Sequence, residues 1–220
     1  MLQRIPTPVI EFLRYMASPD RSENRRPDLA DLLESRVLQG RIHGDSPSTY
    51  AFQPTGSPLQ LPPTQSSSVV TELLPLITVL RNGVPGVLIY EEPEAHLHPR
   101  VQRILAQVLV RLVRAGTTVV LTTHSDTMVQ QFNNYLKLGA LGEAGRQALA
   151  KETGEDIYTD QDALQPEDVG AYEFRFREDG RTDVASLEVR PDGVVRPLFN
   201  QELDSLLREV LILNRLMEAQ

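Results

Sequence analysis

Residues 86–99 read GVLIYEEPEAHLHP, and residues 119–126 read VVLTTHSD. Each stretch begins as an apolar run of the kind that forms a strand buried on both faces of a parallel sheet. The first run ends in the carboxylates Glu91 and Glu92, and the second leads into His124. Open α/β sheets bind their ligands at the carboxyl ends of such strands. The two runs therefore predict that acid and imidazole lie at neighbouring strand ends.

The segment between these runs has the periodicity of a helix with one buried face. Apolar residues recur three and four positions apart over residues 100–115, and Gly116 suits the end of the helix. We expect a strand over 87–90, then this helix, then a second strand over 117–121. This is the βαβ order of a parallel sheet, so the predicted fold class is α/β.

Two adjacent carboxylates at such a strand end suit phosphate hydrolysis. One can hold hydrated Mg²⁺, which prefers oxygen ligands, and the other can orient or deprotonate the water that attacks a γ-phosphate. An isolated Glu-Glu pair is more often a solvated acidic turn, and a lone histidine is more often structural. The βαβ context favours the phosphate interpretation. His96 and His98 alternate as a pair of metal ligands would. Metal binding by this pair is disfavoured, because cysteine is absent and the nearby carboxylates are better explained by phosphate hydrolysis.

These motifs resemble those of a known ATPase family. The segment EEPEAHLHP, the THSD after the next strand and the upstream QSSSVVTELLPLITVL are similar to the Walker B and D-loop, the switch histidine and the signature region of ABC-type ATPases. The resemblance is strongest to the RecF/SMC-like and overcoming-lysogenisation-defect-like AAA family ATPases of prokaryotes. It implies a partial P-loop NTPase fold of ABC type, with a parallel sheet, flanking helices and a small C-terminal antiparallel meander followed by a helix.

The resemblance assigns roles to the residues at the strand ends. Glu91 would be the Mg²⁺-side carboxylate, Glu92 the catalytic base and His124 the sensor of the γ-phosphate, with ATP and Mg²⁺ as cofactors. The family usually has Asp where this chain has Glu91. The extra methylene moves the carboxylate relative to the metal, so turnover could be slower.

The resemblance also implies residues that contact nucleotide across a dimer interface. Ser67 and Ser68 would lie in the signature loop, which contacts the nucleotide held by an opposing protomer. Glu94, Ala95 and His96 would form the D-loop, which crosses that interface. The signature lacks its usual glycine near Ser68, and a Cβ there would crowd a phosphate approached by backbone. The plainer alternative is a serine cluster that caps a core helix.

The phosphate-binding part of such an ATPase is absent from the sequence. A Gly-x-x-x-x-Gly-Lys-Ser/Thr loop cradles the phosphates with its amides and lysine, but no Gly-Lys pair occurs here. The two lysines, Lys137 and Lys151, both follow the switch histidine. We therefore expect the C-terminal half of an ATPase, with the phosphate loop supplied by a missing segment or another chain, or lost. The strand over 87–90 should then lack a neighbour on one side.

Composition narrows the class of protein. The 220 residues contain 22 Lys and Arg against 30 Asp and Glu, a net charge of −8, which argues against a generally basic nucleic-acid surface. The absence of cysteine excludes disulfides and thiolate metal sites. No segment has the pattern of a signal peptide or a membrane span, so we expect a cytoplasmic protein. The expected partner is a second copy or a chain that bears the phosphate loop, with nucleic acid or an effector protein as further candidates.

The chain divides into three expected regions. Residues 1–65 form a helical and β-hairpin region that leads to the signature loop, residues 66–142 form the ATPase core half, and residues 143–220 contain the C-terminal strands and helix. The other expected elements are helices over 9–16, 28–39, 69–80 and 128–141, a hairpin over 41–52 with Tyr50 and Phe52 on opposite faces, a polar and mobile segment over 142–165, a strand over 172–177, a meander through Phe199, and a last helix capped by Asn200.

Three functions compete at this point. The first is the Walker B half of a dimeric ATPase that switches a nucleic-acid-processing or defence assembly. The second is a catalytically inactive interaction module that keeps the fold but binds no nucleotide. The third, a metal-dependent nuclease, is weaker because no further Asp/Glu cluster with ligand spacing follows. A phosphate-loop sequence encoded immediately upstream would separate the first two.

Overall fold

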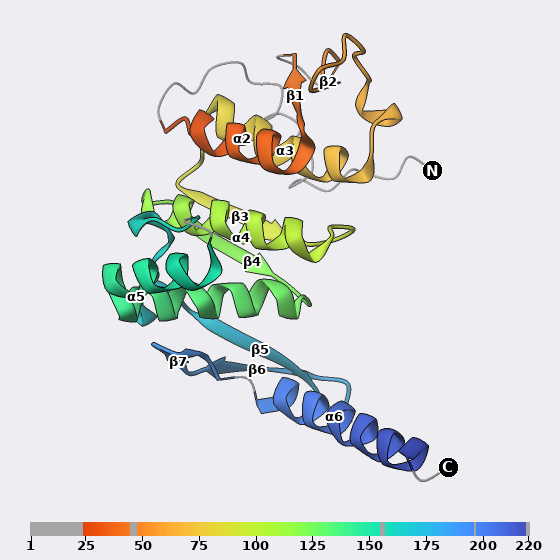
Figure 1. Cartoon of the computed structure of the whole chain (residues 1–220), viewed down its shortest axis with the longest axis vertical. Coiled ribbons are helices and arrows are strands. Elements are labelled where there is room, and N and C mark those ends of the chain that lie inside the picture. The colour runs from red at the N-terminus through yellow and green to blue at the C-terminus, as the bar shows by residue number, and fades with distance from the viewer. Residues whose placement is uncertain (1–23, 45–47, 155–156, 196, 219–220) are drawn as a thin grey trace. The chain divides into compact units, whose positions relative to one another are not determined.

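The protein is described by a computed structural model that covers residues 24–44, 48–154, 157–195 and 197–218 (Figure 1). The chain forms two compact units, Met1–Gln131 and Phe132–Gln220, which we call the N-terminal and C-terminal units and describe separately. The helix expected over 9–16 and the turn expected at 45–47 lie outside the described residues.

The N-terminal unit contains the predicted βαβ segment. Its elements in chain order are α2 (Pro27–Leu33), the π-helical turn η1 (Glu34–Leu38), β1 (Gly40–His43), β2 (Ala51–Pro54), the 3-10 turn η2 (Pro63–Gln65), α3 (Ser68–Asn82), β3 (Val87–Glu91), α4 (Pro99–Arg114), β4 (Thr118–Thr122) and the first part of α5 (Asp126–Thr153). The α/β class is confirmed, and the β3–α4–β4 segment lies within one or two residues of its predicted bounds. The predicted hairpin is also confirmed, because β1 and β2 pair antiparallel.

The two strands that decide the fold pair in parallel and in register. Val87 lies beside Thr118 at one end, and Glu91 lies beside Thr122 at the other. The crossover helix α4 lies against β4 and buries the apolar stripe read from the sequence (Ile104, Leu105, Val108, Leu109 and Leu112). The residues that follow β3 and β4 therefore emerge at the same edge of the sheet.

The sequence predicted that β3 is buried on both faces, but the structure leaves it exposed. Val87 is 56% exposed, Ile89 is 71% exposed and Val120 on the neighbouring strand is 49% exposed. Within the described part of the chain, β4 is the one strand that pairs with β3. The prediction of an open edge is therefore confirmed for these residues. The apolar character of β3 suits a larger sheet than these two strands form.

Aromatic packing on the hairpin also differs from the prediction. Tyr50 and Phe52 were expected on opposite faces, but both are buried, at 6% and 8% exposure. Residues two apart in an extended chain point to the same side, which explains the correction. The hairpin thus directs both rings into the N-terminal unit.

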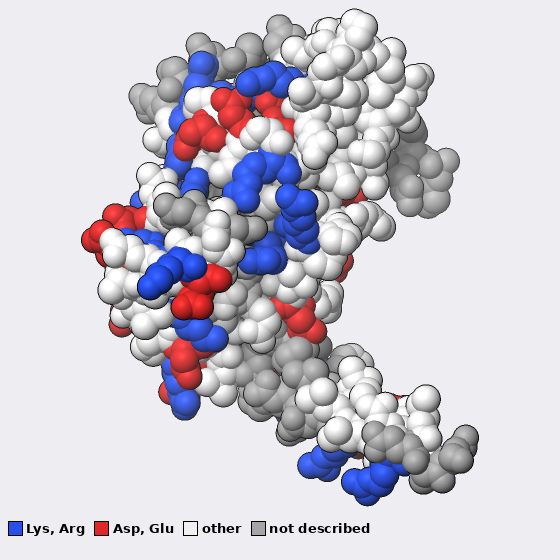
Figure 2. Space-filling model, viewed as in Figure 1, with Lys and Arg blue, Asp and Glu red and all other residues white. Residues whose placement is uncertain are grey.

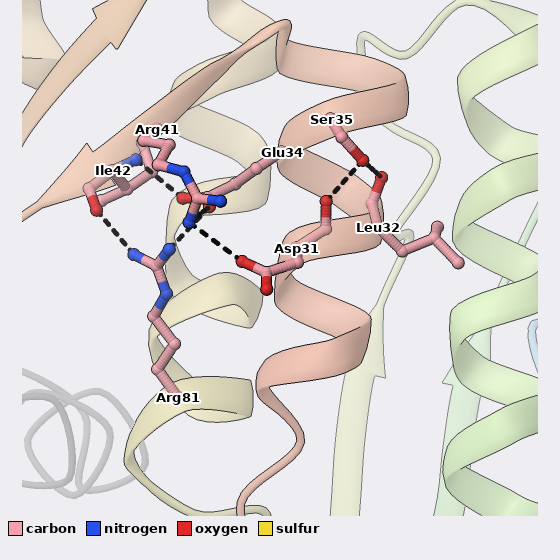
Figure 3. Close-up of polar contacts among 7 residues, drawn as sticks. All are labelled: Asp31, Leu32, Glu34, Ser35, Arg41, Ile42 and Arg81. Atoms are coloured by element: carbon pink, nitrogen blue, oxygen red, sulfur yellow. Dashed lines mark hydrogen bonds and ion pairs between the residues drawn. The ribbon is translucent and has the colours of Figure 1, made fainter.

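The helix expected over 28–39 is replaced by α2 and a π-helical turn that carries a buried acid, Glu34 (Figure 3). The side chain of Glu34 is 2% exposed. Its Oε1 accepts a hydrogen bond from Ile42 N at 2.7 Å, and its Oε2 accepts one from Arg81 Nη2 at 2.6 Å. Arg81 Nη1 also donates to the Ile42 carbonyl at 2.5 Å. The acid thereby joins η1, β1 and α3.

A second arginine lies at the exposed side of this cluster. Arg41 Nη1 is 3.1 Å from Asp31 Oδ1 and 3.8 Å from Glu34 Oε2. Burial raises the pKa of Glu34, while the Ile42 amide and the two arginines act in the opposite direction. The cation that compensates the buried charge most directly is therefore Arg81.

The C-terminal unit is more ordered than its sequence suggested. Its elements are the rest of α5, the 3-10 turns η3 (Asp160–Asp162) and η4 (Pro166–Asp168), the strands β5 (Ala171–Phe176), β6 (Thr182–Leu187), β7 (Val189–Arg190) and β8 (Gly193–Val194), and α6 (Pro197–Glu218). The helical run of α5 is interrupted at Gly142, which has φ 62° and ψ −152°, and then continues to Thr153.

The polar segment over 142–165, which was expected to be mobile, contains regular structure in the described residues. The helix extends to Thr153, and the following turns are tied back to it. Leu164 N donates to the Tyr135 carbonyl at 3.1 Å, and the fully buried Asp162 accepts a hydrogen bond from Thr159 N at 2.7 Å. Polar composition therefore concealed a segment that is held by backbone and capping hydrogen bonds.

The strands of this unit confirm the antiparallel prediction, with one boundary error. β5 pairs with β6, and β7 pairs with β8, both antiparallel. Phe199 was expected to end the meander and Asn200 to cap the last helix, but α6 begins at Pro197 and includes both residues. Proline has a φ suited to the first turn of a helix, which explains the earlier start.

We expect Gly139→Ala to lower the free energy of unfolding of the C-terminal unit by roughly 1–3 kcal/mol. A Cβ at Gly139 would overlap the carbonyl oxygen of Leu164, and backbone cannot move aside as a side chain can. The collision outweighs the gain of about 1 kcal/mol that Ala usually brings to a helix. Chemical denaturation followed by circular dichroism measures the change. Gly86→Ala is the control, because its Cβ would meet nothing within 4 Å. Unchanged stability of Gly139→Ala would contradict the prediction.

Candidate functional site

The structure brings Glu92 and His124 together at the carboxyl ends of the parallel strands. Glu92 directly follows β3, and His124 lies two residues after β4. The distance from His124 Nε2 to Glu92 Oε1 is 3.8 Å. Both side chains are largely exposed, at 89% and 58%. The two groups are thus close enough to act on one ligand from solvent, and their catalytic roles stay predictions.

The backbone of Glu92 has an unusual conformation. Its φ is +41°, in the left-handed region that non-glycine residues rarely adopt. Its N–H donates to Thr122 at the end of β4, to the carbonyl oxygen at 3.0 Å and to Oγ1 at 3.2 Å. Such backbone strain persists only where the surrounding structure holds it, and it gathers at functional sites. The conformation turns the chain sharply at the point where the carboxylate leaves the sheet.

The proposed metal ligand lies beside this turn. Glu91 is the last residue of β3, is exposed, and faces Thr122 across the parallel register. Exposed carboxylate oxygens at a strand end suit the oxygen-rich coordination of Mg²⁺, which keeps several of its waters. Among the described residues, no group of three or more His, Asp or Glu side chains is arranged to hold a metal ion by itself. A metal at Glu91 would therefore need ligands from water and from substrate.

The residues of the expected D-loop form a tight turn after Glu92. Ala95 N donates to the Glu92 carbonyl at 2.9 Å, and Leu97 N donates to the Glu94 carbonyl at 3.0 Å. His96 is exposed and has φ +59°, a second left-handed non-glycine residue in this loop. The D-loop role of these residues stays a prediction.

The side chain of Glu94 turns inward, toward the loop after β4. Its Oε1 accepts three hydrogen bonds, from Thr123 Oγ1 at 2.7 Å, His124 N at 2.8 Å and Ser125 N at 3.2 Å. Its Oε2 is buried and accepts no hydrogen bond from the described residues. The resemblance implied that Glu94 contacts nucleotide, which stays a prediction. The structure shows that its carboxylate accepts hydrogen bonds from the loop after β4.

His98 contributes to the start of α4. It occupies the N-cap position, and its Nδ1 accepts a hydrogen bond from Arg100 N at 3.2 Å. A side chain that accepts from the first turn satisfies one of the amides that a helix leaves open. The capping contact gives His98 a structural role, so its alternation with His96 does not require a metal site.

Ser67 and Ser68 lie at the start of α3, where the resemblance to the signature region placed them. Ser67 is the N-cap residue, and its carbonyl accepts from Val70 N and Thr71 N, but its side chain makes no capping hydrogen bond. Both serines are exposed, and no hydrogen bond or ion pair described in the structure joins them to Glu92 or His124. The signature role stays a prediction.

Two residues that the sequence did not single out support the loop after β4. Ser125 Oγ donates to Gln102 Oε1 at 2.5 Å, and Gln102 Nε2 donates to the Leu97 carbonyl at 2.8 Å. Ser125 Oγ also accepts from Met128 N at 3.2 Å, which caps α5. The pair Ser125-Asp126 is a typical helix start, so it could have moved the predicted start from 128 to the observed 126.

Charged side chains of both signs share the surface. On the face shown in Figure 2, Lys and Arg lie beside Asp and Glu over the N-terminal unit. Among the described residues of this unit, Arg26 pairs with Asp28 at 2.8 Å and Arg41 with Asp31 at 3.1 Å. None of the helices in the described residues has the length and apolar character needed to cross a membrane.

Comparison with known proteins points to ATPases. A family model described as "AAA domain, putative AbiEii toxin, Type IV TA system" matches residues 8–129, more than half of the chain. UvrABC system protein A of Methanothermobacter thermautotrophicus is 34% identical over 99 residues, which cover 44% of this chain and 10% of that protein. This chain therefore spans about a tenth of the length of that relative.

A solved structure shows a weaker likeness. It is described under "Structural biochemistry of ATP-driven dimerization and DNA stimulated activation of SMC ATPases" and has a TM-score of 0.44 with 12% sequence identity. The match covers 81% of this chain and 87% of that chain.

Proposed function

Because the chain belongs to this AAA domain family of ATPases, we propose that it is the Walker B, D-loop and switch-histidine part of an ABC-type ATPase. The observation that carries the proposal is the approach of Glu92 and His124 to 3.8 Å at the ends of paired parallel strands. An exposed acidic turn without a function would need neither the imidazole of a second strand nor a left-handed residue. Both features support the proposal, because α/β sheets bind their ligands at the carboxyl ends of their strands.

Each side chain has a distinct part in the proposed reaction. Glu92 accepts the proton of the attacking water, and His124 donates a hydrogen bond to the γ-phosphate from the neighbouring strand end. Glu91 would supply a carboxylate oxygen to Mg²⁺, and the bound ion would neutralise charge on the phosphates. The exposure of Glu91, Glu92 and His124 leaves these groups accessible to a nucleotide held by other residues.

We infer that the phosphate-binding loop comes from another segment or another chain. The sequence printed here holds no Gly-Lys pair, and the open edge of β3 offers unpaired backbone groups to a further parallel strand. The exposed Val87 and Ile89 supply apolar surface for the helix that would accompany such a strand. In the dimer implied by the signature and D-loop residues, ATP would join two protomers, and hydrolysis would switch a nucleic-acid-processing or defence assembly.

Reconstitution tests this function. The chain is produced together with the phosphate-loop segment or protein encoded beside it, and phosphate release from Mg-ATP is measured. Turnover that requires both parts supports the ATPase. A complex that forms but neither binds nor hydrolyses ATP would instead identify an inactive interaction module.

The chain alone is expected to bind Mg-ATP with a Kd no tighter than about 1 mM. The amides and lysine that make most phosphate contacts are missing from its sequence, and the acidic groups at the strand ends repel a polyphosphate. Isothermal titration calorimetry on the 220 residues measures this, with the reconstituted complex as the positive control. Micromolar binding by the chain alone would contradict the prediction.

A further inference from the structure

The two loops that carry Glu92 and His124 are each held by the loop of the other strand. Glu92 N donates to the carbonyl and Oγ1 of Thr122, at the end of β4. In return, the amides of His124 and Ser125 donate to the carboxylate of Glu94, two residues beyond Glu92. The contacts are reciprocal, so neither loop can shift without breaking hydrogen bonds to the other.

The Glu94 carboxylate is the centre of this arrangement. Three donors meet at its Oε1 within 2.7–3.2 Å, and its Oε2 is buried. Hydrogen bonds to an ionised acceptor are roughly twice as strong as those between neutral groups. One side chain therefore fixes the backbone of residues 123–125 on both sides of the His124 Cα.

We infer that Glu94 is a positioning residue, which sets the place of the His124 imidazole relative to Glu92 through the backbone of residues 123–125. The inference rests on the proposed function, because it concerns the residues proposed to act on the γ-phosphate. Glu94 itself need not touch substrate. A ligand contact on the outer side of the Glu92–Leu97 turn would be transmitted through Glu94 to His124, since the buried carboxylate joins the two loops.

Amide hydrogen exchange tests the positioning role without nucleotide. In the ¹⁵N-labelled 220-residue chain, Glu94→Ala should speed exchange of the His124 amide by about 10- to 100-fold, the effect of losing a hydrogen bond to a charged acceptor. The Ser125 amide should be affected less, because it also donates to Thr123 Oγ1 at 3.0 Å. The β3–β4 ladder amides and the Glu92 amide should change by less than about 3-fold. Asp31→Ala is the control, because it removes an exposed carboxylate of the same unit that pairs with Arg41.

The possible results separate the alternatives. Selective acceleration at the His124 amide supports the inference. Unchanged exchange there overturns it, and so does an equal increase at all amides, because the side chain would then serve only general stability. If the alanine variant does not fold, Glu94→Gln decides. It keeps the acceptor oxygen but not the charge, so we expect about 3- to 10-fold acceleration at the His124 amide. No acceleration would overturn the inference.

Kinetics in the reconstituted complex give the second readout. Glu94→Ala should lower kcat and leave KM for ATP within about 3-fold, and it should add little when combined with His124→Ala, because both act through the same imidazole. Additive losses would overturn the positioning role. Selective amide exchange without any ATPase activity would reject the proposed function and keep the link between the loops. ATPase activity of the complex together with unchanged amide exchange in Glu94→Ala would keep the proposed function and reject the link between the loops.

Discussion

Glu92→Gln is expected to lower ATP turnover of the reconstituted complex by about 10²- to 10⁴-fold, while nucleotide-dependent association persists. The amide cannot accept the proton of the attacking water, but it keeps the size of the side chain and the backbone contacts with Thr122. Removing a negative charge near the phosphates should not weaken their binding. His124→Ala should resemble Glu92→Gln in rate. Phosphate release measures turnover, and size-exclusion chromatography with Mg-ATP measures association.

Asp126→Asn is the matched control for Glu92→Gln. It removes an exposed carboxylate from the same edge of the sheet, in the first turn of α5, where no catalytic role is proposed. Its turnover should stay within about 3-fold of the unchanged complex. Near-normal hydrolysis by Glu92→Gln would show that another group is the base.

Arg81→Gln is expected to lower the free energy of unfolding of the N-terminal unit by about 3–5 kcal/mol at neutral pH. The variant leaves the Glu34 carboxylate, 2% exposed, without the guanidinium that lies 2.6 Å away. Glu34→Gln should cost less, because Arg81 is 30% exposed and can be hydrated. Arg41→Gln is the control, since Arg41 is 64% exposed, and should cost less than about 1 kcal/mol. Urea denaturation followed by circular dichroism gives the three values.

The pH dependence of the stability loss in Arg81→Gln shows whether the buried charge of Glu34 causes it. Burial raises the pKa of Glu34 above its ordinary value of 4.5, so its contribution to stability is fully present below pH 4.5 and is lost as the pH rises through the folded-state pKa. Arg81→Gln removes an attraction that opposes this shift. The deficit of the variant should therefore be largest near neutral pH and shrink as the pH falls through the raised folded-state pKa, where Glu34 takes up a proton. A deficit independent of pH would show that lost packing of the arginine stem is responsible.

Local pattern predicted the part of the fold that carries the site. The strand, helix and strand over residues 87–122 follow from apolar runs and helical periodicity, and the approach of Glu92 to His124 follows from parallel pairing. The stretch after Gly142 misled because its polar composition suggested a mobile segment, whereas the hydrogen bond from Leu164 N to the Tyr135 carbonyl joins residues 29 positions apart. Such ties leave no periodic signal.

The two acids that organise the N-terminal unit could not be recognised from sequence. Glu34 has the pattern of a surface carboxylate on a helix, but its partner Arg81 lies 47 positions away. The donors to Glu94 lie 29–31 positions away and are backbone amides and a hydroxyl, which any sequence offers. The sequence therefore indicated the groups proposed to face the ligand, and the structure was needed to find those that hold them.

The left-handed backbone at Glu92 has an evolutionary consequence. A side chain in that conformation costs about 1–2 kcal/mol, and glycine adopts it freely. Random mutation toward a sturdier fold would therefore replace the residue proposed to activate water. If Glu92 is the base proposed above, a lineage that needs ATP hydrolysis should keep it despite this cost, whereas one that does not should drift toward glycine or asparagine there. Under the proposed function, we expect relatives that hydrolyse ATP to keep an acid at this position and inactive relatives to lose it.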